Sequence, residues 1–260
     1  MQSRHIKQLS AGGNTDEYKQ LLTYIKRIWS KRSPESWLDY LRAEGMRIGT
    51  GTTLFSKPSA VLIDLTRPWL IEIGKNVQIT IGVKILTHGY DWSVLKGKYG
   101  EVLGSAGKVT IGDNCFIGMN TVILKGTSIG KNTIIGAGSV VTGGGYPSDC
   151  VIAGNPVKVI CSLDEYREKR QKAQLAEAVE LVQEYYSVYG YVPPKEELAE
   201  FFWLFEERTK IENKAFIGKM KCVNNYEASM DAFLSSEPLF HSYDAFIEHA
   251  LKGGDKFLTG

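Results

Sequence analysis

The sequence predicts a mainly β fold, a parallel β-solenoid in which short strands stack coil upon coil. The first observation is an aliphatic residue at every sixth position through the middle of the chain. A helix repeats about every 3.6 residues and a half-buried strand about every 2, so this period indicates stacked units instead. These aliphatic anchors are Ile111, Ile117, Ile123, Ile129, Ile135 and Val141.

The second observation is that small residues occupy fixed positions after the anchors. Thr or Ser stands four positions after four of the anchors, at Thr121, Thr127, Thr133 and Ser139, where a small side chain fits inside a narrow coil. Glycine often follows the anchor directly, and we expect it to form corners with positive φ. Each unit of six residues then forms one face of a triangular coil, which cannot bury its core alone. The glycines are Gly112, Gly118, Gly130 and Gly136.

The third observation is an upstream block with the same spacing, interrupted before the main repeat. Ile111 follows Ile85 by 26 positions, which is not a multiple of six. A segment at about 89–108 is therefore predicted to loop out of the coil. Functional residues are commonly placed on such loops, because a rigid scaffold holds them in position. The upstream anchors are Ile73, Ile79 and Ile85.

Helical patterns flank the repeat on both sides. Apolar residues recur at helical spacing within 16–42, and a long charged helix is expected over 163–189. A further helix, rich in phenylalanine, is expected over about 195–208, followed by short helices near Met230 and Phe246. The predicted parts are an N-terminal helical cap at 1–45, the solenoid at 46–160 and a helical C-terminal extension at 161–260.

Composition excludes several classes of function. The 260 residues carry a net charge of +2, spread along the chain without a basic stripe, so nucleic acid is not an expected partner. No apolar run approaches the ~20 residues that cross a bilayer, and residues 1–19 are too polar for a signal peptide. We therefore expect a cytoplasmic protein. The four cysteines show no zinc or redox spacing, so no metal is expected.

Three stretches carry a resemblance to a known family: 85–88, reading Ile-Leu-Thr-His before the predicted loop, the run 135–142, and 153–158, reading Ala-Gly-Asn-Pro-Val-Lys. Over about 48–160 the chain resembles the hexapeptide-repeat (left-handed β-helix) acyltransferases, closest to the sugar, maltose and galactoside O-acetyltransferase branch. The resemblance implies a left-handed coil and acetyl-CoA as donor. It also implies a homotrimer with active sites between subunits.

His88 is the expected catalytic residue. Of the four histidines, it alone lies in the repeat region, where the loop departs. The zinc carbonic anhydrases of this fold use three histidines from the coils, so that function is excluded. A hydroxyl acceptor needs a base near neutral pH, and imidazole, with an unperturbed pKa of about 6.5, suits this role. By resemblance His88 matches the family's catalytic histidine, with direct transfer and no covalent intermediate.

A second group should orient the His88 ring. Asp91 is the nearest carboxylate in sequence and is the predicted partner. Asp64, Glu72, Glu101 or a backbone carbonyl remain alternatives. Asp91 also fits a turn residue that stabilises its own loop.

The resemblance also implies the residues that bind the two substrates. Met119, Ala137 and Thr142 match positions along the pantetheine groove, and Lys158 is placed to meet the CoA phosphates. Two features depart from the family: a lysine common in relatives is absent from the glycine-rich turn at 143–145, and Cys161 replaces a basic residue. The predicted acceptor-binding residues, all in the loop, are Tyr90, Trp92 and Glu101.

The sequence thus predicts an acetyl-CoA-dependent O-acetyltransferase that acts on a carbohydrate, with cell-surface polysaccharide synthesis as its expected setting. An N-acetyltransferase acting on an amino sugar or an antibiotic is the alternative enzyme. A non-catalytic scaffolding solenoid is the alternative outside enzymes, and the departures at 143–145 are its support.

Overall fold

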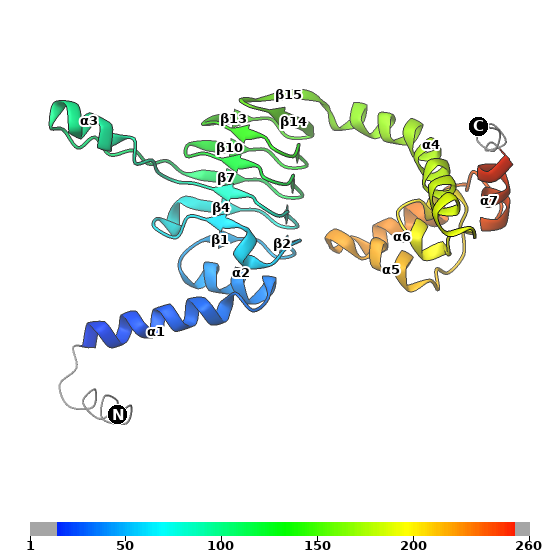
Figure 1. Ribbon diagram of the computed structural model, residues 1–260, viewed down its shortest axis with the longest axis horizontal. Helices are drawn as coiled ribbons and strands as arrows, with labels where there is room; N and C mark the ends of the chain where they lie inside the picture. Colours follow the sequence, from blue (N-terminus) through cyan, green and yellow to red (C-terminus); the bar gives the residue numbers. More distant parts are fainter. Residues whose placement is uncertain (1–14, 253–260) are drawn as a thin grey trace. The chain divides into compact units, whose positions relative to one another are not determined.

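The computed structural model describes residues 15–252 (Figure 1). The chain divides between Ser162 and Leu163 into two compact units. The first unit contains the β-solenoid with two N-terminal helices, and the second is helical. Each unit has its own buried hydrophobic cluster.

Three parallel sheets form the faces of the solenoid, and the chain passes from the first to the second to the third in each of the four complete coils. The first sheet contains β1 (Arg47–Ile48), β4 (Ile71–Ile73), β7 (Val109–Ile111), β10 (Thr127–Ile129) and β13 (Gly144–Tyr146). The second contains β2 (Thr53–Leu54), β5 (Gln78–Ile79), β8 (Phe116–Ile117), β11 (Ile134–Ile135), β14 (Cys150–Gly154) and β15 (Val157–Ser162). The third contains β3 (Leu62–Ile63), β6 (Lys84–Ile85), β9 (Val122–Ile123) and β12 (Val140–Val141). The stack ends in the antiparallel β14–β15 hairpin.

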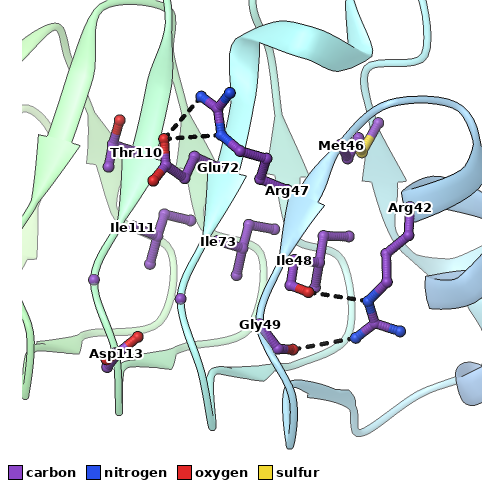
Figure 2. A pocket seen from close by; sticks show the side chains of 12 residues that line it. Arg42, Met46, Arg47, Ile48, Gly49, Glu72, Ile73, Thr110, Ile111 and Asp113 are labelled. Atoms are coloured by element: carbon purple, nitrogen blue, oxygen red, sulfur yellow. Dashed lines mark hydrogen bonds and ion pairs between the residues drawn. The ribbon is translucent and has the colours of Figure 1, made fainter.

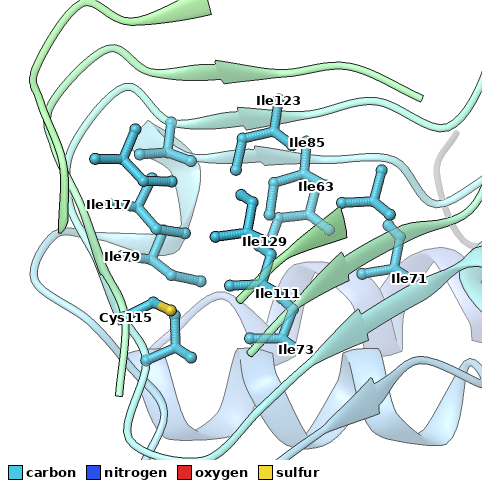
Figure 3. Close-up of a cluster of buried hydrophobic side chains, with 14 of the residues drawn as sticks. Ile63, Ile71, Ile73, Ile79, Ile85, Ile111, Cys115, Ile117, Ile123 and Ile129 are labelled. Carbon is cyan, nitrogen blue, oxygen red and sulfur yellow. The ribbon is translucent and has the colours of Figure 1, made fainter. Parts of the chain in front are cut away.

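The six-residue anchors form the core of the solenoid, as the period predicts. Ile73 lies opposite Ile111, and Ile111 opposite Ile129, so the anchors of successive coils stack inside the prism. Figure 3 shows these isoleucine side chains packed against one another. Burying one such side chain contributes roughly 1.5–3 kcal/mol, and the stack repeats it coil after coil. Fully buried anchors include Ile79, Ile85, Ile117, Ile123, Ile135 and Val141.

The corners correct the expected role of the glycines. In the described residues, positive φ falls on residues such as Asn114 and Asn132, not on the glycine that follows the anchor. Asn114 Nδ2 donates to Asn132 Oδ1 at 2.9 Å, so these corners also form a ladder along the stack. A Cβ on Gly118 would lie 2.5 Å from the backbone nitrogen of Ala137 on the next coil. Close approach of neighbouring coils, rather than φ, requires glycine there.

Two helices precede the solenoid, α1 (Thr15–Ser30) and α2 (Pro34–Ala43). Ser33 caps α2, because its Oγ accepts from the backbone nitrogen of Ser36 at 3.2 Å. Trp37, Leu38 and Leu41 of α2 are buried in the solenoid's cluster. Helix α2 therefore covers the open end of the coil. Short 3₁₀ turns, η2 (Pro58–Ala60) and η3 (Pro68–Leu70), lie between the early strands.

The projecting loop leaves the coil after β6 and carries helix α3 (Trp92–Tyr99), which stands away from the stack in Figure 1. Its two ends come together at the coil, where His88 forms an antiparallel bridge with Ala106. The backbone nitrogen of Gly107 donates to the carbonyl of Thr87 at 2.9 Å. The base of the loop is thus fixed although its tip is exposed.

The second unit packs around buried aromatic side chains. Phe202 stacks on Phe216 with ring centroids 4.7 Å apart. The single helix expected over 195–208 is wrong: two 3₁₀ turns stand there, because closely spaced aromatics must all enter one cluster and a continuous helix would spread them around its axis. The elements are α4 (Leu163–Tyr189), η4 (Lys195–Leu198), η5 (Phe202–Leu204), α5 (Lys214–Met220), η6 (Cys222–Asn224), α6 (Tyr226–Leu234) and α7 (Tyr243–Lys252).

Candidate active site

His88 lies at the corner between the third and first sheets, where the loop departs. Its ring nitrogen Nδ1 is 2.6 Å from Oδ2 of Asp64 and 3.2 Å from Oγ1 of Thr66. Asp64 directly follows β3, one coil before His88, and its backbone nitrogen donates to the carbonyl of Ile85 at 3.0 Å. Parallel pairing of β3 with β6 therefore brings the carboxylate to the ring, across 24 positions of sequence.

The Asp64 carboxylate is nearly enclosed, with a side chain only 4% exposed. The backbone nitrogen of Thr87 donates to Oδ2 at 3.1 Å, and the Thr87 hydroxyl also donates to it. Thr66 donates to Oδ1 from its backbone nitrogen at 2.9 Å and from its hydroxyl at 2.7 Å. Burial pushes the pKa of Asp64 upward, but the hydrogen bonds from Thr87 and Thr66 outweigh it and hold the pKa well below its usual range.

An ionised carboxylate can only accept hydrogen bonds, and this decides the tautomer of neutral His88. The proton must sit on Nδ1, where it is donated to Asp64. Nε2 then carries the lone pair, and it can accept a proton from a substrate. The pair is arranged as a base with its orienting carboxylate.

The orienting group differs from the residue nearest in sequence. Among the described residues, the carboxylate that contacts His88 is Asp64, one of the alternatives, while Asp91 forms no side-chain hydrogen bond with the ring. Asp91 precedes α3, where its Oδ1 lies over Gly89. Glu72 pairs with Arg47 and Lys108 on the outer surface of the first sheet.

Aromatic side chains of the loop extend outward from His88. The Tyr90 ring meets the His88 ring edge-on, with centroids 5.1 Å apart, and the Trp92 ring lies 6.2 Å beyond Tyr90. Tyr90 is 67% exposed, so its ring forms an open surface beside the base. Glu101, in contrast, is exposed on the returning arm of the loop.

The predicted donor-binding residues fall at separate places in the solenoid. Met119 and Ala137 are neighbours on successive coils at the corner between the second and third sheets. Thr142 follows β12 at the same corner as His88, and its carbonyl accepts from the Tyr146 hydroxyl at 3.0 Å. Lys158 is exposed on β15. The register thus groups Met119 with Ala137, and places Thr142 along the corner that carries His88.

Sequence reasoning missed Lys125 and the two threonines beside Asp64. Lys125 Nζ donates to Oγ of Ser105 and so attaches the returning arm of the loop to the coil. Thr66 and Thr87 supply the donors that keep Asp64 ionised. A signal was present for Thr87, which precedes His88 directly, but Thr66 is recognised only once β3 is paired with β6.

A surface depression elsewhere on the unit has a different character. It lies between α2 and the first sheet, and Figure 2 shows the side chains that line it. Arg42 donates to the carbonyls of Ile48 and Gly49, at 3.0 and 3.1 Å. Arg47 donates to Glu72. The guanidinium groups of Arg42 and Arg47 in this depression therefore already bind protein oxygens, so the depression does not present a free cation to an anionic ligand.

Two further features of residues 15–252 bear on function. No group of three or more His, Cys, Asp or Glu side chains in this part of the chain is arranged to hold a metal ion. None of its helices is both long and apolar enough to cross a bilayer. Cys115 is buried, and burial raises the pKa of its thiol to about 11, so this thiol is a packing residue and not a nucleophile.

Comparison with known proteins agrees with the repeat. The family model for bacterial transferase hexapeptide (six repeats) matches residues 108–143. Protein CapG of Staphylococcus aureus is 42% identical over 131 residues, which cover 50% of this chain and 74% of CapG. Putative acetyltransferase YvoF of Bacillus subtilis (strain 168) is 32% identical over 139 residues, covering 54% of this chain and 73% of YvoF.

A solved structure shows a more limited likeness. The crystal structure of a maltose O-acetyltransferase from Clostridium difficile 630 is 26% identical, with a TM-score of 0.41, over 56% of this chain and 84% of that chain. The identity and coverage of CapG, together with the match of the family model, are sufficient to assign the family. The chain belongs to the hexapeptide-repeat acyltransferases, and its three parallel sheets are the left-handed β-helix of that family.

Proposed function

We propose that this protein transfers an acetyl group from acetyl-CoA to a hydroxyl of a carbohydrate, with His88 as general base. The observation that carries the proposal is the contact between His88 Nδ1 and the buried, ionised Asp64. It fixes the ring and leaves Nε2 for the substrate. Relatives named as acetyltransferases support acetyl as the transferred group. The aromatic side chains of the loop beside His88 support a sugar as the acceptor.

The proposed reaction takes place in one complex of enzyme and both substrates. The acceptor hydroxyl gives its proton to Nε2 of His88 as its oxygen attacks the thioester carbonyl. The tetrahedral intermediate then collapses, the carbon–sulfur bond breaks, and the CoA sulfur takes the proton back from His88. Asp64 stabilises the imidazolium between these two steps. No covalent acyl-enzyme is needed, because donor and acceptor react directly.

The donor site that we propose runs along the stacked coils, near the general base His88. Met119, Ala137 and Thr142 would line the pantetheine arm, and Lys158 would meet the phosphates. All four belong to corners or strands with exposed surface. On the acceptor side, we propose Tyr90, Trp92 and Glu101 as sugar contacts. Stacking of a sugar ring on Tyr90 would bring a hydroxyl toward His88, because the two side chains touch.

We further propose a homotrimer acting in the cytoplasm, with each active site completed by a neighbouring copy. The exposed surface around His88 and Tyr90 leaves room for such a neighbour. The alternative of an amine acceptor can be tested by measuring acetyl transfer while amino-sugar and hydroxyl substrates compete. The scaffold alternative has less support, since a merely structural histidine does not require an ionised, nearly enclosed carboxylate.

The first test is acetyl transfer by His88→Ala. Turnover is expected to fall by about 10²–10⁴-fold, because the variant lacks the general base. The binding of CoA, measured by calorimetric titration, should be retained. His241→Ala is the matched control, since His241 is exposed in the second unit. Unchanged turnover in His88→Ala would contradict the proposed base, and absence of CoA binding in the unmodified protein would favour the scaffold.

A further inference from the structure

Helix α1 carries an apolar face that no other described residue of its unit covers. Ser30, at its C-terminal end, is its one buried residue among those with described side chains. Leu21 is 54% exposed and Trp29 is 66% exposed. Large apolar side chains of this kind are normally buried, and a continuous row of them marks an interaction surface. The row is Tyr18, Leu21, Leu22, Ile25, Ile28 and Trp29.

The spacing places the whole row on one side of the helix. Its members recur at i, i+3, i+4 and i+7, the pattern of a helix with one apolar face. Lys26 lies one turn after Leu22, along one edge of this face, and Arg27 lies on the opposite, polar side of the helix. The guanidinium of Arg32 lies 5.9 Å from the centre of the Trp29 ring. The C-terminal half of α1 and the residues just after it therefore carry positive charge close to the apolar face.

We propose that α1 binds the surface of an anionic lipid bilayer, with the apolar face inserted among the headgroups. The helix is amphipathic and polar on its opposite side, so it can lie in the interface but cannot span. Residues 15–32 contain five basic and two acidic side chains, a local excess that suits anionic headgroups although the net charge of the chain is only +2.

Aromatic composition and charge favour lipid over a second copy. Tyr18, Tyr24 and Trp29 combine an apolar ring with a polar tip, the property that enriches these residues at membrane interfaces. If α1 paired with α1 of another copy, symmetry would bring the same patch against itself. In a parallel pair, the basic C-terminal ends of the two helices would lie side by side and repel each other. An anionic lipid surface presents the opposite charge, so it suits the basic side chains as well as the apolar face.

The test is sedimentation of the full chain with vesicles. One set contains phosphatidylcholine and phosphatidylglycerol in equal amounts, and the other only phosphatidylcholine. We expect binding to the anionic set and weakening by salt. Ile25→Asp should lower the affinity about tenfold or more, because it puts a charge in the middle of the inserted face. Gln20→Asp is the matched control, with the same charge change on another side of the helix, and should stay within about twofold.

Ile25 and Gln20 are both exposed, so neither substitution is expected to disturb folding, and circular dichroism checks this. The proposal is overturned if the unmodified chain does not sediment with anionic vesicles, or if Ile25→Asp binds them as well as Gln20→Asp does. Loss of an oligomer in Ile25→Asp without vesicle binding would identify the face as a contact between copies. The inference does not depend on acetyl transfer.

Discussion

A single buried carboxylate decides how His88 can react. Asp64 receives four hydrogen bonds from Thr66 and Thr87 and keeps its charge despite burial. This charge sets the tautomer of the ring and stabilises the imidazolium that proton transfer would create. The threonines never need to touch the substrate. Their role is to position Asp64 and, through it, His88.

Asp64→Asn tests this charge in stability and in turnover. We expect the free energy of unfolding to fall by about 1–3 kcal/mol at neutral pH, because the amide cannot accept hydrogen bonds from all the donors that the carboxylate satisfies. Turnover should also fall, since an amide nitrogen can donate to Nδ1 and favour the wrong tautomer. Asp91→Asn is the control, and unfolding in urea is the measurement. Equal effects of the two substitutions would contradict the role of Asp64.

The pH dependence of the same substitution has a defined sign. The folded pKa of Asp64 lies below its unfolded value of about 3.9. Its stabilisation is therefore fully present above the unfolded pKa and is lost as pH falls through the lower folded pKa. Acid unfolding of Asp64→Asn should show a flatter dependence on pH below about 4 than the unmodified chain. A parallel pair of curves would show that the carboxylate is not responsible.

At the scale of the element, the solenoid depends on how closely its coils approach. Gly118 and Ala137 stand on neighbouring coils at the corner between the second and third sheets, which also holds the proposed pantetheine residues. A side chain at Gly118 would push the coils apart. Helix α3, by contrast, stands free of the stack, and its Gly97 has open space around it.

Gly118→Ala is therefore expected to destabilise the first unit by about 1–3 kcal/mol, through a clash that the packed coils cannot relieve. Gly97→Ala makes the same chemical change within an exposed helix. It should be neutral or stabilising by up to about 1 kcal/mol, because alanine has the higher helix propensity. Thermal unfolding of both variants checks the pair. The crowding explanation fails if Gly118→Ala is as stable as Gly97→Ala.

At the scale of the whole molecule, residues 15–252 form two hydrophobic clusters that share no residue. The solenoid cluster includes Ile135, and the helical cluster includes Phe233. Units with separate cores can unfold separately. We propose the first to be the transferase part and the second to be an extension with its own stability.

Scanning calorimetry of the full chain tests this separation. Ile135→Ala should lower the free energy of unfolding of the first unit by about 2–5 kcal/mol, since this side chain is fully buried. Phe233 is also fully buried, so Phe233→Ala should lower that of the second unit by about 3–5 kcal/mol. Each substitution is expected to lower the midpoint of one transition and leave the other in place. Acetyl transfer measured at low temperature should survive Phe233→Ala. A single transition that moves with either substitution would mean that the two units unfold together.

The sequence alone determined the coil, because a period of six residues has one structural explanation and each anchor depends only on its local spacing. It also indicated His88, since histidine at the departure of the loop is a local feature. Only the tertiary structure decided the partner of His88. Asp64 lies 24 positions before His88. Because the segment between β3 and β6 is irregular, the register that pairs these two strands could not be read from the sequence. Proximity along the chain favoured Asp91, but contacts between stacked coils follow the register of the strands and not the distance in sequence.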